Sequence, residues 1–449
     1  MQVKLLSNQN IEDRAKYIAA AGKLSRFEGD VFDVLDSCED YGKNLNLIKR
    51  ITAMGHESII DHDYFVFAIK DVSPIVEQLL IKERIVSFTI KSRREVDFSN
   101  AGFYVPSFAG REDLQAKYKE HMQYLFDSYA ELLEQGVTRE DARFVLPYCY
   151  YSNIIMGCDA RVLKNIIIRF TKGKESAIAE VRELGEVLKK IAEESAPYLI
   201  DIIDNATPKF IIDKMAKVDY NIIDEVKLLS HTPDVDNAII TSSLMRTCQL
   251  DEAQAAAMMA GMDAEEYINE INEDFEQLDF TQVNFRFQIP ISLAVLTHIT
   301  RHRTHDILVP DFLPINNLEY FKTPPSIKNV AEFKEIFAKN KAVYDWFVAG
   351  GAAPEDLVYF HLSGNMVNIV TNMNGKALAW ICRLRRCTKA QWEMRDIANQ
   401  FYKLAAGKCE HYAKVLAPDC ETKKFCGEGK ESRDRLEVIL NREKVAESA

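Results

Sequence analysis

The chain has no apolar run approaching the roughly 20 residues that a membrane-spanning helix needs. Its first six residues, Met1 to Leu6, run straight into an apolar stretch without the pattern of a secretory signal peptide. Both absences favour a protein of the cytoplasm. We therefore expect a soluble, cytoplasmic protein that does not span a membrane.

The composition is also poor in positive charge and in metal-binding cysteine patterns. Lys and Arg number 56 against 68 Asp and Glu, a net charge of −12, whereas a general nucleic-acid binder usually has a basic face. The nine cysteines contain no Cys-x-x-Cys pair, which indicates reduced thiols. No Gly-x-Gly-x-x-Gly fingerprint is present, which argues against a Rossmann-type dinucleotide site. We expect no nucleic-acid partner, and an anionic ligand would need clustered arginines.

What the sequence does contain is an internal repeat. Its length of 449 residues already exceeds that of a usual single domain. Val3–Ser7 returns unchanged as Val226–Ser230, an offset of 223 residues. A second block, which begins at Gly136, recurs without a gap at an offset of 215. We therefore predict two tandem copies, residues 1–224 and 225–449.

Each copy shows the same order of predicted elements. A short strand leads into a helix, and later an alternating apolar stretch predicts a half-buried strand at 64–69 and at 283–289. Pro74 and Pro290 follow these strands, and we expect each to open a helix, where a missing N–H costs little. The last third of each copy has helical periodicity. The predicted fold class is α/β (α+β), with a small sheet and a helical C-terminal part in each copy.

Two basic clusters in the second copy could carry chemistry. Arg301-His302-Arg303 ends an apolar helical stretch, and donors that are costly to bury without partners could bind a phosphate or an electron-rich ring. A solvated helix end, whose dipole favours cations, is the alternative. His298 and His302 lie one helical turn apart, but the flanking arginines would repel a cation, so we expect no metal site. The second cluster, residues 383–395, is by itself a basic helix segment.

Together these clusters resemble the flavin-dependent thymidylate synthases, whose signature is Arg-His-Arg, seven residues, then Ser. In the second copy the Arg-His-Arg is followed later by Leu-Arg at 384–385 and by Ala-Gln-Trp-Glu-Met-Arg at 390–395. The first copy resembles other segments of the family. It has Gly-His-Glu-Ser at 55–58, Ser-x-Arg at 92–94 and Ala-Arg at 142–143. The resemblance covers nearly the whole chain, with one subunit-length copy in each half.

Each copy lacks what the other has. The family positions that are lost in the first copy are Lys82, Glu83 and Phe170, and those lost in the second are Asp311, Leu313 and Val358. The family builds its site between subunits, so the resemblance implies one composite site with a half-set from each copy. Random decay of a paralogue is the alternative, but it would not favour complementary losses.

The resemblance implies roles for individual residues. Those implied to be catalytic are Ser92, as a hydrogen-bond donor near the base and not a covalent nucleophile, and Arg385. Those implied to bind substrate are Arg94, Arg143, His298, Arg301 and Arg385. Those implied to bind the cofactor are His56, Ser58, Arg301, His302, Arg303, Asn374 and Lys376. Two of these depart from the family, since His298 stands for a Gln and Lys376 for an Arg.

By resemblance, the expected reaction is the reductive methylation of dUMP to dTMP with FAD as cofactor. Methylenetetrahydrofolate would supply the carbon, and NADPH would reduce the flavin. The family's homotetramer implies that two fused chains form a homodimer equivalent to four units. Two alternatives stay open. The chain could act on another pyrimidine with altered catalysis, or it could be an inactive paralogue that binds flavin, a pyrimidine nucleotide or both.

Overall fold

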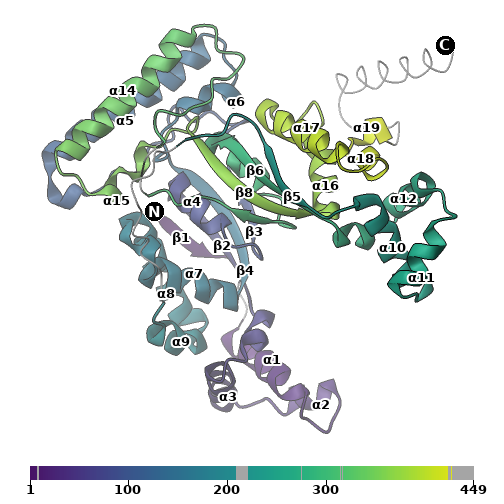
Figure 1. Cartoon of the computed structure of the whole chain (residues 1–449). Helices are drawn as coiled ribbons and strands as arrows, with labels where there is room; N and C mark the ends of the chain where they lie inside the picture. The colour runs from purple at the N-terminus through teal and green to yellow at the C-terminus, as the bar shows by residue number, and fades with distance from the viewer. Residues whose placement is uncertain are drawn as a thin grey trace, which may run out of the picture. The chain divides into compact units, whose positions relative to one another are not determined.

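Two four-stranded antiparallel sheets form the framework of the chain in a computed structural model, which describes residues 1–7, 10–208, 221–274, 276–313, 315, 317–422 and 426. The chain divides into two compact units, each of which is described by itself (Figure 1). The first unit joins Met1–Asp219 to Phe312–Gly364. The second joins Tyr220–Asp311 to Asn365–Ala449. The end of the second predicted copy, after residue 426, lies outside the described residues.

The sheet of the first unit has the strand order β1-β2-β4-β3. Its strands are β1 (Gln2–Leu5), β2 (Tyr64–Val72), β3 (Ser87–Ile90) and β4 (Ser152–Asp159). The alternating sequence of β2 places Phe65, Phe67 and Ile69 on one buried face. Helices α7 (Ala160–Lys172) and α8 (Ala179–Ser195) pack against this sheet. Burial of large apolar side chains between sheet and helices forms the core.

The sheet of the second unit repeats this order as β5-β6-β8-β7. Its strands are β5 (Lys227–His231), β6 (Asn284–Ser292), β7 (Asp306–Leu308) and β8 (Met366–Asn374). Phe285, Phe287 and Ile289 of β6 are buried at the positions that match the apolar face of β2. Helices α16 (Gly375–Arg385) and α17 (Trp392–Ala406) pack against this sheet. The predicted fold class and the repeated layout are confirmed.

A group of three helices follows the first strand of each unit. The groups are α1 (Ile11–Leu24), α2 (Val31–Asp36) and α3 (Tyr41–Ala53), and α10 (Val235–Cys248), α11 (Glu252–Met259) and α12 (Ala264–Glu273). Short polar residues start most of these helices. Asn10, Asp40 and Asp251, for example, each accept a backbone N–H of the first turn. The smaller helices include α6 (Arg139–Ala142), α9 (Ile200–Asn205), α15 (Pro354–Leu357), α18 (Tyr412–Val415) and α19 (Asp419–Thr422).

The same carboxylate clamp fixes one short helix in each unit. Ser73 is the N-cap of α4 (Pro74–Ile81), and its N–H and hydroxyl donate to Glu180 of α8 at 2.8 and 2.5 Å. Ser292 is the N-cap of α13 (Leu293–Ile299), and it donates in the same way to Glu393 of α17, at 2.7 Å for both bonds. The first N–H groups of a helix need such acceptors. A shared detail of this kind supports the repeat independently of the sheets.

One predicted helix start is wrong. Pro74 opens α4 as expected, but Pro290 lies inside β6 opposite Asn368, and α13 begins only at Leu293. Strand β5 pairs with β6 no further than Gln288, so among the described residues β6 has a strand neighbour on one side only at this point. A proline is tolerated there because one edge of the strand makes no ladder hydrogen bonds.

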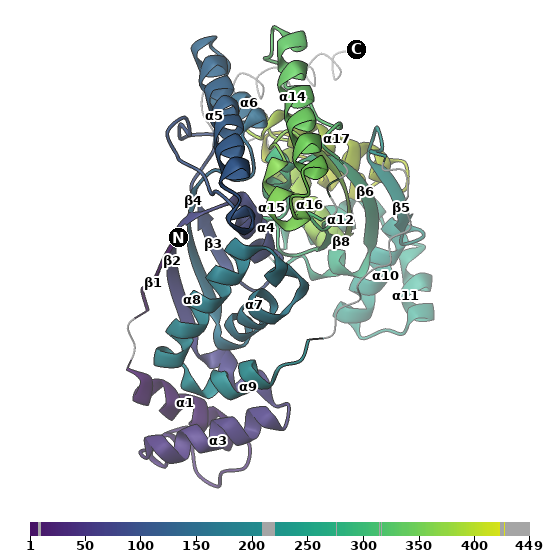
Figure 2. The ribbon, with the colours of Figure 1, turned by 90° about the vertical axis from the view of Figure 1, so that its left-hand side faces the viewer.

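The first unit contains the long helix of each copy. Helices α5 (Glu112–Glu134) and α14 (Val330–Ala349) lie side by side in both views of the ribbon (Figures 1 and 2). His121 of α5 and Asn340 of α14 share a buried hydrogen bond of 2.9 Å. Residues 312–364, which belong to the second predicted copy, therefore fold with the first unit. The units therefore differ from the predicted copies. The boundary between the copies at 224/225 concerns the sequence repeat and stays a prediction.

The two copies also meet within the first unit through a reciprocal backbone contact. The N–H of Tyr148 donates to the carbonyl of His361 at 2.8 Å, and the N–H of Ser363 donates to that of Leu146 at 2.9 Å. At the repeat offset of 215, His361 corresponds to Leu146 and Ser363 to Tyr148. The contact is therefore self-complementary, as at a two-fold axis between identical subunits.

Candidate functional site

The two basic segments of the second unit meet at the ends of α13 and α16. Arg385, the last residue of α16, donates from Nε to His302 Nε2 at 2.9 Å. It also donates from Nη2 to the carbonyl of His298 at 3.4 Å. His298 and His302 are buried, whereas Arg385 is half-buried. The fold thus joins three predicted site residues that are up to 87 positions apart in the sequence.

The other predicted residues of the second unit surround the same two helices. Arg301 is exposed and Arg303 is half-buried, just after α13. Asn374 is the N-cap of α16, and its Oδ1 accepts the N–H of Ala377 at 2.8 Å. Lys376, in the first turn, donates to the carbonyl of Glu276. Cationic side chains therefore lie at the C-terminal end of α13 and in the first turn of α16.

The histidines of this segment have separate partners. His305 Nδ1 lies 2.6 Å from Thr371 Oγ1, and its Nε2 lies 3.3 Å from the carbonyl of Ile299. His302 Nε2 faces Arg385. Among the residues that the structure describes, no group of three or more His, Cys, Asp or Glu side chains could hold a metal ion.

In the first unit, Glu140 brings the predicted arginines together. Arg94 Nε donates to the Glu140 carboxylate, and Arg143 Nε donates to the Glu140 carbonyl at 3.0 Å. The N–H of Arg94 also donates to Ser92 Oγ at 3.3 Å. Arg143 is only 2% exposed. Burial, and then the charge of Arg93, lowers the pKa of Arg143 to about 10, so this guanidinium is still protonated at neutral pH.

Two further predicted residues of the first unit lie on another element. His56 is the N-cap of the 3-10 helix η1 (Glu57–His62), and Ser58 lies inside that helix. Both side chains are exposed. Helix η1 packs against α1 and α7, whereas Ser92 follows β3. The structure therefore brings Ser92, Arg94 and Arg143 together and places His56 and Ser58 on a separate element.

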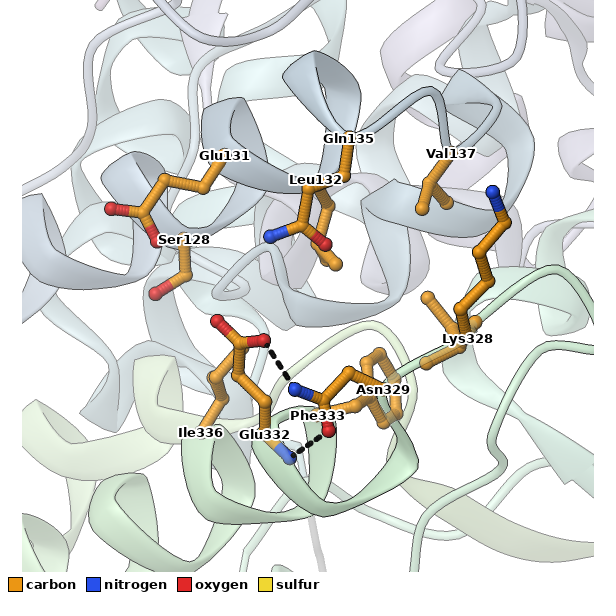
Figure 3. Close-up of a pocket in the computed structure, with 11 residues that line it drawn as sticks. Ser128, Glu131, Leu132, Gln135, Val137, Lys328, Asn329, Glu332, Phe333 and Ile336 are labelled. Carbon is orange, nitrogen blue, oxygen red and sulfur yellow. Dashed lines mark hydrogen bonds between the residues drawn. The ribbon is translucent and has the colours of Figure 1, made fainter.

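A small pocket in the first unit lies between α5 and the start of α14 (Figure 3). Asn329, the N-cap of α14, exchanges hydrogen bonds there with Glu332. None of the pocket's 11 lining residues is a predicted site residue. We therefore do not assign this pocket to the site.

A sequence profile described as "Thymidylate synthase complementing protein" matches residues 4–198 and, a second time, residues 227–409. The two matches cover well over half of the chain. The chain belongs to this family. It contains two repeats of the thymidylate synthase complementing protein unit, as its sequence predicted.

Curated relatives carry the name flavin-dependent thymidylate synthase. The one from Geobacter sulfurreducens is 34% identical over 155 residues, which are 33% of this chain and 65% of the relative. The one from Pyrococcus abyssi is 33% identical over 153 residues, 32% of this chain and 62% of the relative. The chain thus spans just under two thirds of each relative's length.

Among solved structures, a UMP/dUMP methylase from Streptomyces cacaoi bound with 5-Br dUMP is similar to part of the chain. Its TM-score is 0.40 at 22% sequence identity, and the match covers 45% of this chain and 94% of that one. No helix of the described residues is long and apolar enough to cross a membrane.

Sequence reasoning missed one buried pair in this family member. Arg93, the middle residue of the Ser-x-Arg segment, donates from Nη1 to Glu77 at 2.6 Å, and its guanidinium lies 5.6 Å from the ring centre of Tyr150. Burial opposes the charge, but the carboxylate of Glu77 outweighs it and raises the pKa of Arg93. The doublet Arg93-Arg94 was visible in the sequence, whereas the partner on α4 was not.

Proposed function

We propose that the chain is an FAD-dependent methyltransferase that converts dUMP to dTMP, with methylenetetrahydrofolate as carbon donor and NADPH as reductant. Family membership and the names of the curated relatives support this reaction. The observation that carries the proposal is the arginine set. Arg385 is oriented in the second unit, and Arg94 and Arg143 are gathered around Glu140 in the first.

The donors of the second unit fit a flavin dinucleotide. Arg301 and Arg303 offer guanidinium forks that suit the oxygens of a diphosphate, and Lys376 adds a third cation near the start of α16. Asn374 and His302 complete the predicted cofactor set, with His56 and Ser58 from the first copy. The reduced flavin supplies the hydride when it is bound.

The donors of the first unit fit a nucleotide phosphate. Arg143 remains cationic at neutral pH although it is buried. Arg94 lies half-buried beside it, and Ser92 adds a hydroxyl. Several guanidinium groups offset the cost of desolvating a phosphate dianion. Glu140 would give up or share Arg94 when a phosphate arrives, because both compete for the same N–H groups.

The protein's own contribution to the chemistry is electrostatic. Arg385, together with Arg301 and His298, would bind the base side of the nucleotide. A fixed guanidinium stabilises the negative charge that develops on a uracil ring as C6 accepts a hydride. Ser92 would donate a hydrogen bond near the base. No covalent bond to the protein is required.

A composite site would draw one half-set from each copy, residues 1–224 and 225–449. The reciprocal contact of Tyr148 and Leu146 with His361 and Ser363 supports this idea, because the copies pair there as two subunits of a symmetric dimer would. We further propose that two chains associate to give four family units.

The proposal is tested with the purified full-length chain. Its visible spectrum should show bound flavin that dUMP perturbs. Incubation with dUMP, methylenetetrahydrofolate and NADPH should yield dTMP, and R385A should lower that yield. An intact spectral response without dTMP would leave a binding protein, which is the alternative that Asp311 and Leu313 at two signature positions favour. A chain that takes up neither FAD nor dUMP would overturn both the proposed enzyme and the binding-protein alternative.

A further inference from the structure

A groove runs along one outer strand of the second unit. Strand β5 is the outermost strand of its sheet, and among the described residues no strand pairs with its far side (Figures 1 and 2). Six consecutive residues, 226–231, line the groove together with Leu404 and Lys408, at and just after the end of α17. Its volume is about 820 Å³. Six residues of a strand span about 20 Å, so the groove is long enough for a short extended segment.

The backbone of an edge strand carries hydrogen-bonding groups that its own sheet does not use. In an antiparallel pair, some N–H and C=O groups point towards the neighbouring strand and the alternate ones point away from it. Among the described strands, β5 forms its ladder with β6. An exposed edge of this kind accepts an extended peptide as a further strand, held by main-chain hydrogen bonds. The far side of β5 is therefore a place where a fifth strand can add.

The ionisable side chains that line the groove are basic. Lys227 and Lys408 are exposed, and His231 is half-buried. The described lining residues include no Asp or Glu. A lysine at a sheet edge disfavours pairing with apolar strands, but it attracts a carboxylate. The groove is therefore complementary to an acidic segment, although the whole chain has a net charge of −12.

Leucine side chains add apolar surface to the same groove. Leu229 is 45% exposed, and Leu228 and Leu404 are half-buried. The register of β5 with β6 shifts at Leu229. Successive side chains of an extended strand point to opposite faces. A segment in which acidic and apolar residues alternate would therefore fit both the lysines and the leucines.

The first unit contains the same strand sequence with different surroundings. Val-Lys-Leu-Leu-Ser occurs in both copies, and β1 is also the outermost strand of its sheet. At the offset of 223, His231 corresponds to Asn8. At the offset of 213 that relates the two clamp glutamates, Lys408 corresponds to Ser195. Two of the three basic residues of the groove therefore belong to the second copy alone.

We propose that this groove is a docking site for an extended acidic segment of a partner protein, which adds to β5 as a fifth strand. Main-chain hydrogen bonds give the affinity, and Lys227, His231 and Lys408 select acidic side chains. The inference is independent of the proposed reaction, because none of the described lining residues is a predicted site residue.

Binding of a labelled seven-residue peptide in which Glu alternates with Val tests the proposal by fluorescence anisotropy. We expect saturable binding to the full-length chain, and about tenfold weaker binding of a peptide with Thr in place of Glu. Lys227→Glu combined with Lys408→Glu should weaken the Glu peptide roughly tenfold, the scale of two exposed ion pairs. Lys4→Glu combined with Lys190→Glu makes the same change of charge at exposed positions of the first unit. This matched control should change the affinity by less than about twofold.

A second readout tests the addition of a strand. N-methylation removes main-chain donors and leaves the side chains in place. Methylation of one alternating set of peptide residues should weaken binding about tenfold or more, and methylation of the other set should have less effect. Hydrogen–deuterium exchange of residues 226–231 should slow when the peptide is bound, whereas that of residues 3–7 should not change. The methylated peptides are tested on the wild-type chain, so this readout does not depend on the folding of a variant.

Three results would each overturn the proposal: no saturable binding of the Glu peptide, equal effects of the two double variants, or unchanged exchange of residues 226–231. A second copy of the chain is the other occupant to test. If K227E/K408E converts a dimer into a monomer in light scattering, and exchange of residues 226–231 depends on protein concentration, the strand pairs with a second copy and the proposal is wrong. Circular dichroism checks that each variant is folded.

Discussion

At the scale of single residues, the two copies differ at two buried positions. Glu77 and Arg93 form a buried ion pair in the first unit. At the repeat offset of 219, the second copy has Leu296 and Phe312. Replacing a buried ion pair by apolar residues of similar volume is often neutral, whereas removing one partner leaves an uncompensated charge. The sequence of the second copy therefore suggests which apolar residues to place at these two positions.

We predict that Glu77→Leu and Arg93→Phe each destabilise the protein by about 3–5 kcal/mol, and that the double variant recovers most of this loss. Unfolding in urea, followed by circular dichroism, measures all three. If the two losses simply add in the double variant, the pair does not behave as one unit. In that case apolar side chains at the two positions do not replace the ion pair.

Two substitutions, one in each copy, test the proposed composite site. Arg143→Ala in the first copy and Arg385→Ala in the second should each weaken dUMP binding about tenfold to a hundredfold, because each removes a charge-assisted contact. Isothermal titration with dUMP measures both. Arg182→Ala, at an exposed position on α8, is the control. Weakening by only one of the two arginines would contradict a site built from both copies.

At the scale of elements, the carboxylate that holds the start of α4, Glu180 of α8, has a shifted pKa. Burial raises the pKa of Glu180 to about 7, against the effect of its hydrogen bonds from Ser73 and Tyr359. A raised carboxyl pKa means that the folded chain binds the proton more tightly than the unfolded chain. Its contribution therefore favours folding at acid pH, and it is lost as the pH rises from about 4.5 to about 7.

We predict that Glu180→Gln removes this dependence. Between pH 5 and pH 8 the wild type should lose up to about 3 kcal/mol of unfolding free energy from this group, whereas E180Q should lose less. Urea unfolding at both pH values gives the comparison. Glu183→Gln, an exposed glutamate on the same helix, is the control. If the wild type and E180Q lose the same unfolding free energy between the two pH values, Glu180 does not titrate in this range.

The helices and strands also show how much of the fold could be predicted from the sequence alone. The strand at Tyr64–Ile69 was predictable because alternation of apolar residues reports a half-buried face directly. Pro290 was misplaced because a proline signals a helix start and an unpaired strand edge equally well. The packing of α14 against α5 had no local signal, since it joins residues more than 200 positions apart. The contact of Arg385 with His302 needed the fold for the same reason.

At the scale of the whole molecule, assembly is the first expectation to test. A family that forms four-unit assemblies should need two of these chains, and closed two-fold symmetry makes a homodimer the expected end state. Light scattering should give twice the chain mass of 51.3 kDa. A stable monomer at micromolar concentration would contradict the four-unit expectation without affecting the repeat.

The number of sites per chain follows from the complementary losses. A symmetric four-unit assembly would have two sites for each tandem chain. The half-sets that were kept are Ser92, Arg94 and Arg143 from the first copy and Arg301 and Arg385 from the second. The lost half-sets contain Glu83, which is paired with Arg169, and Asp311. A phosphate would meet carboxylates there, and like charges repel it.

We therefore predict one FAD and one nucleotide per 449-residue chain. Flavin absorbance against protein concentration gives the first ratio, and calorimetric titration with dUMP gives the second. Asp311→Ser combined with Leu313→Arg would restore two signature residues of the second copy, but Glu83 and Phe170 would still oppose them. That variant should therefore keep a single dUMP site. Two tight dUMP sites per wild-type chain would refute the prediction that the second site does not bind. The family membership, which rests on both repeats, would stand.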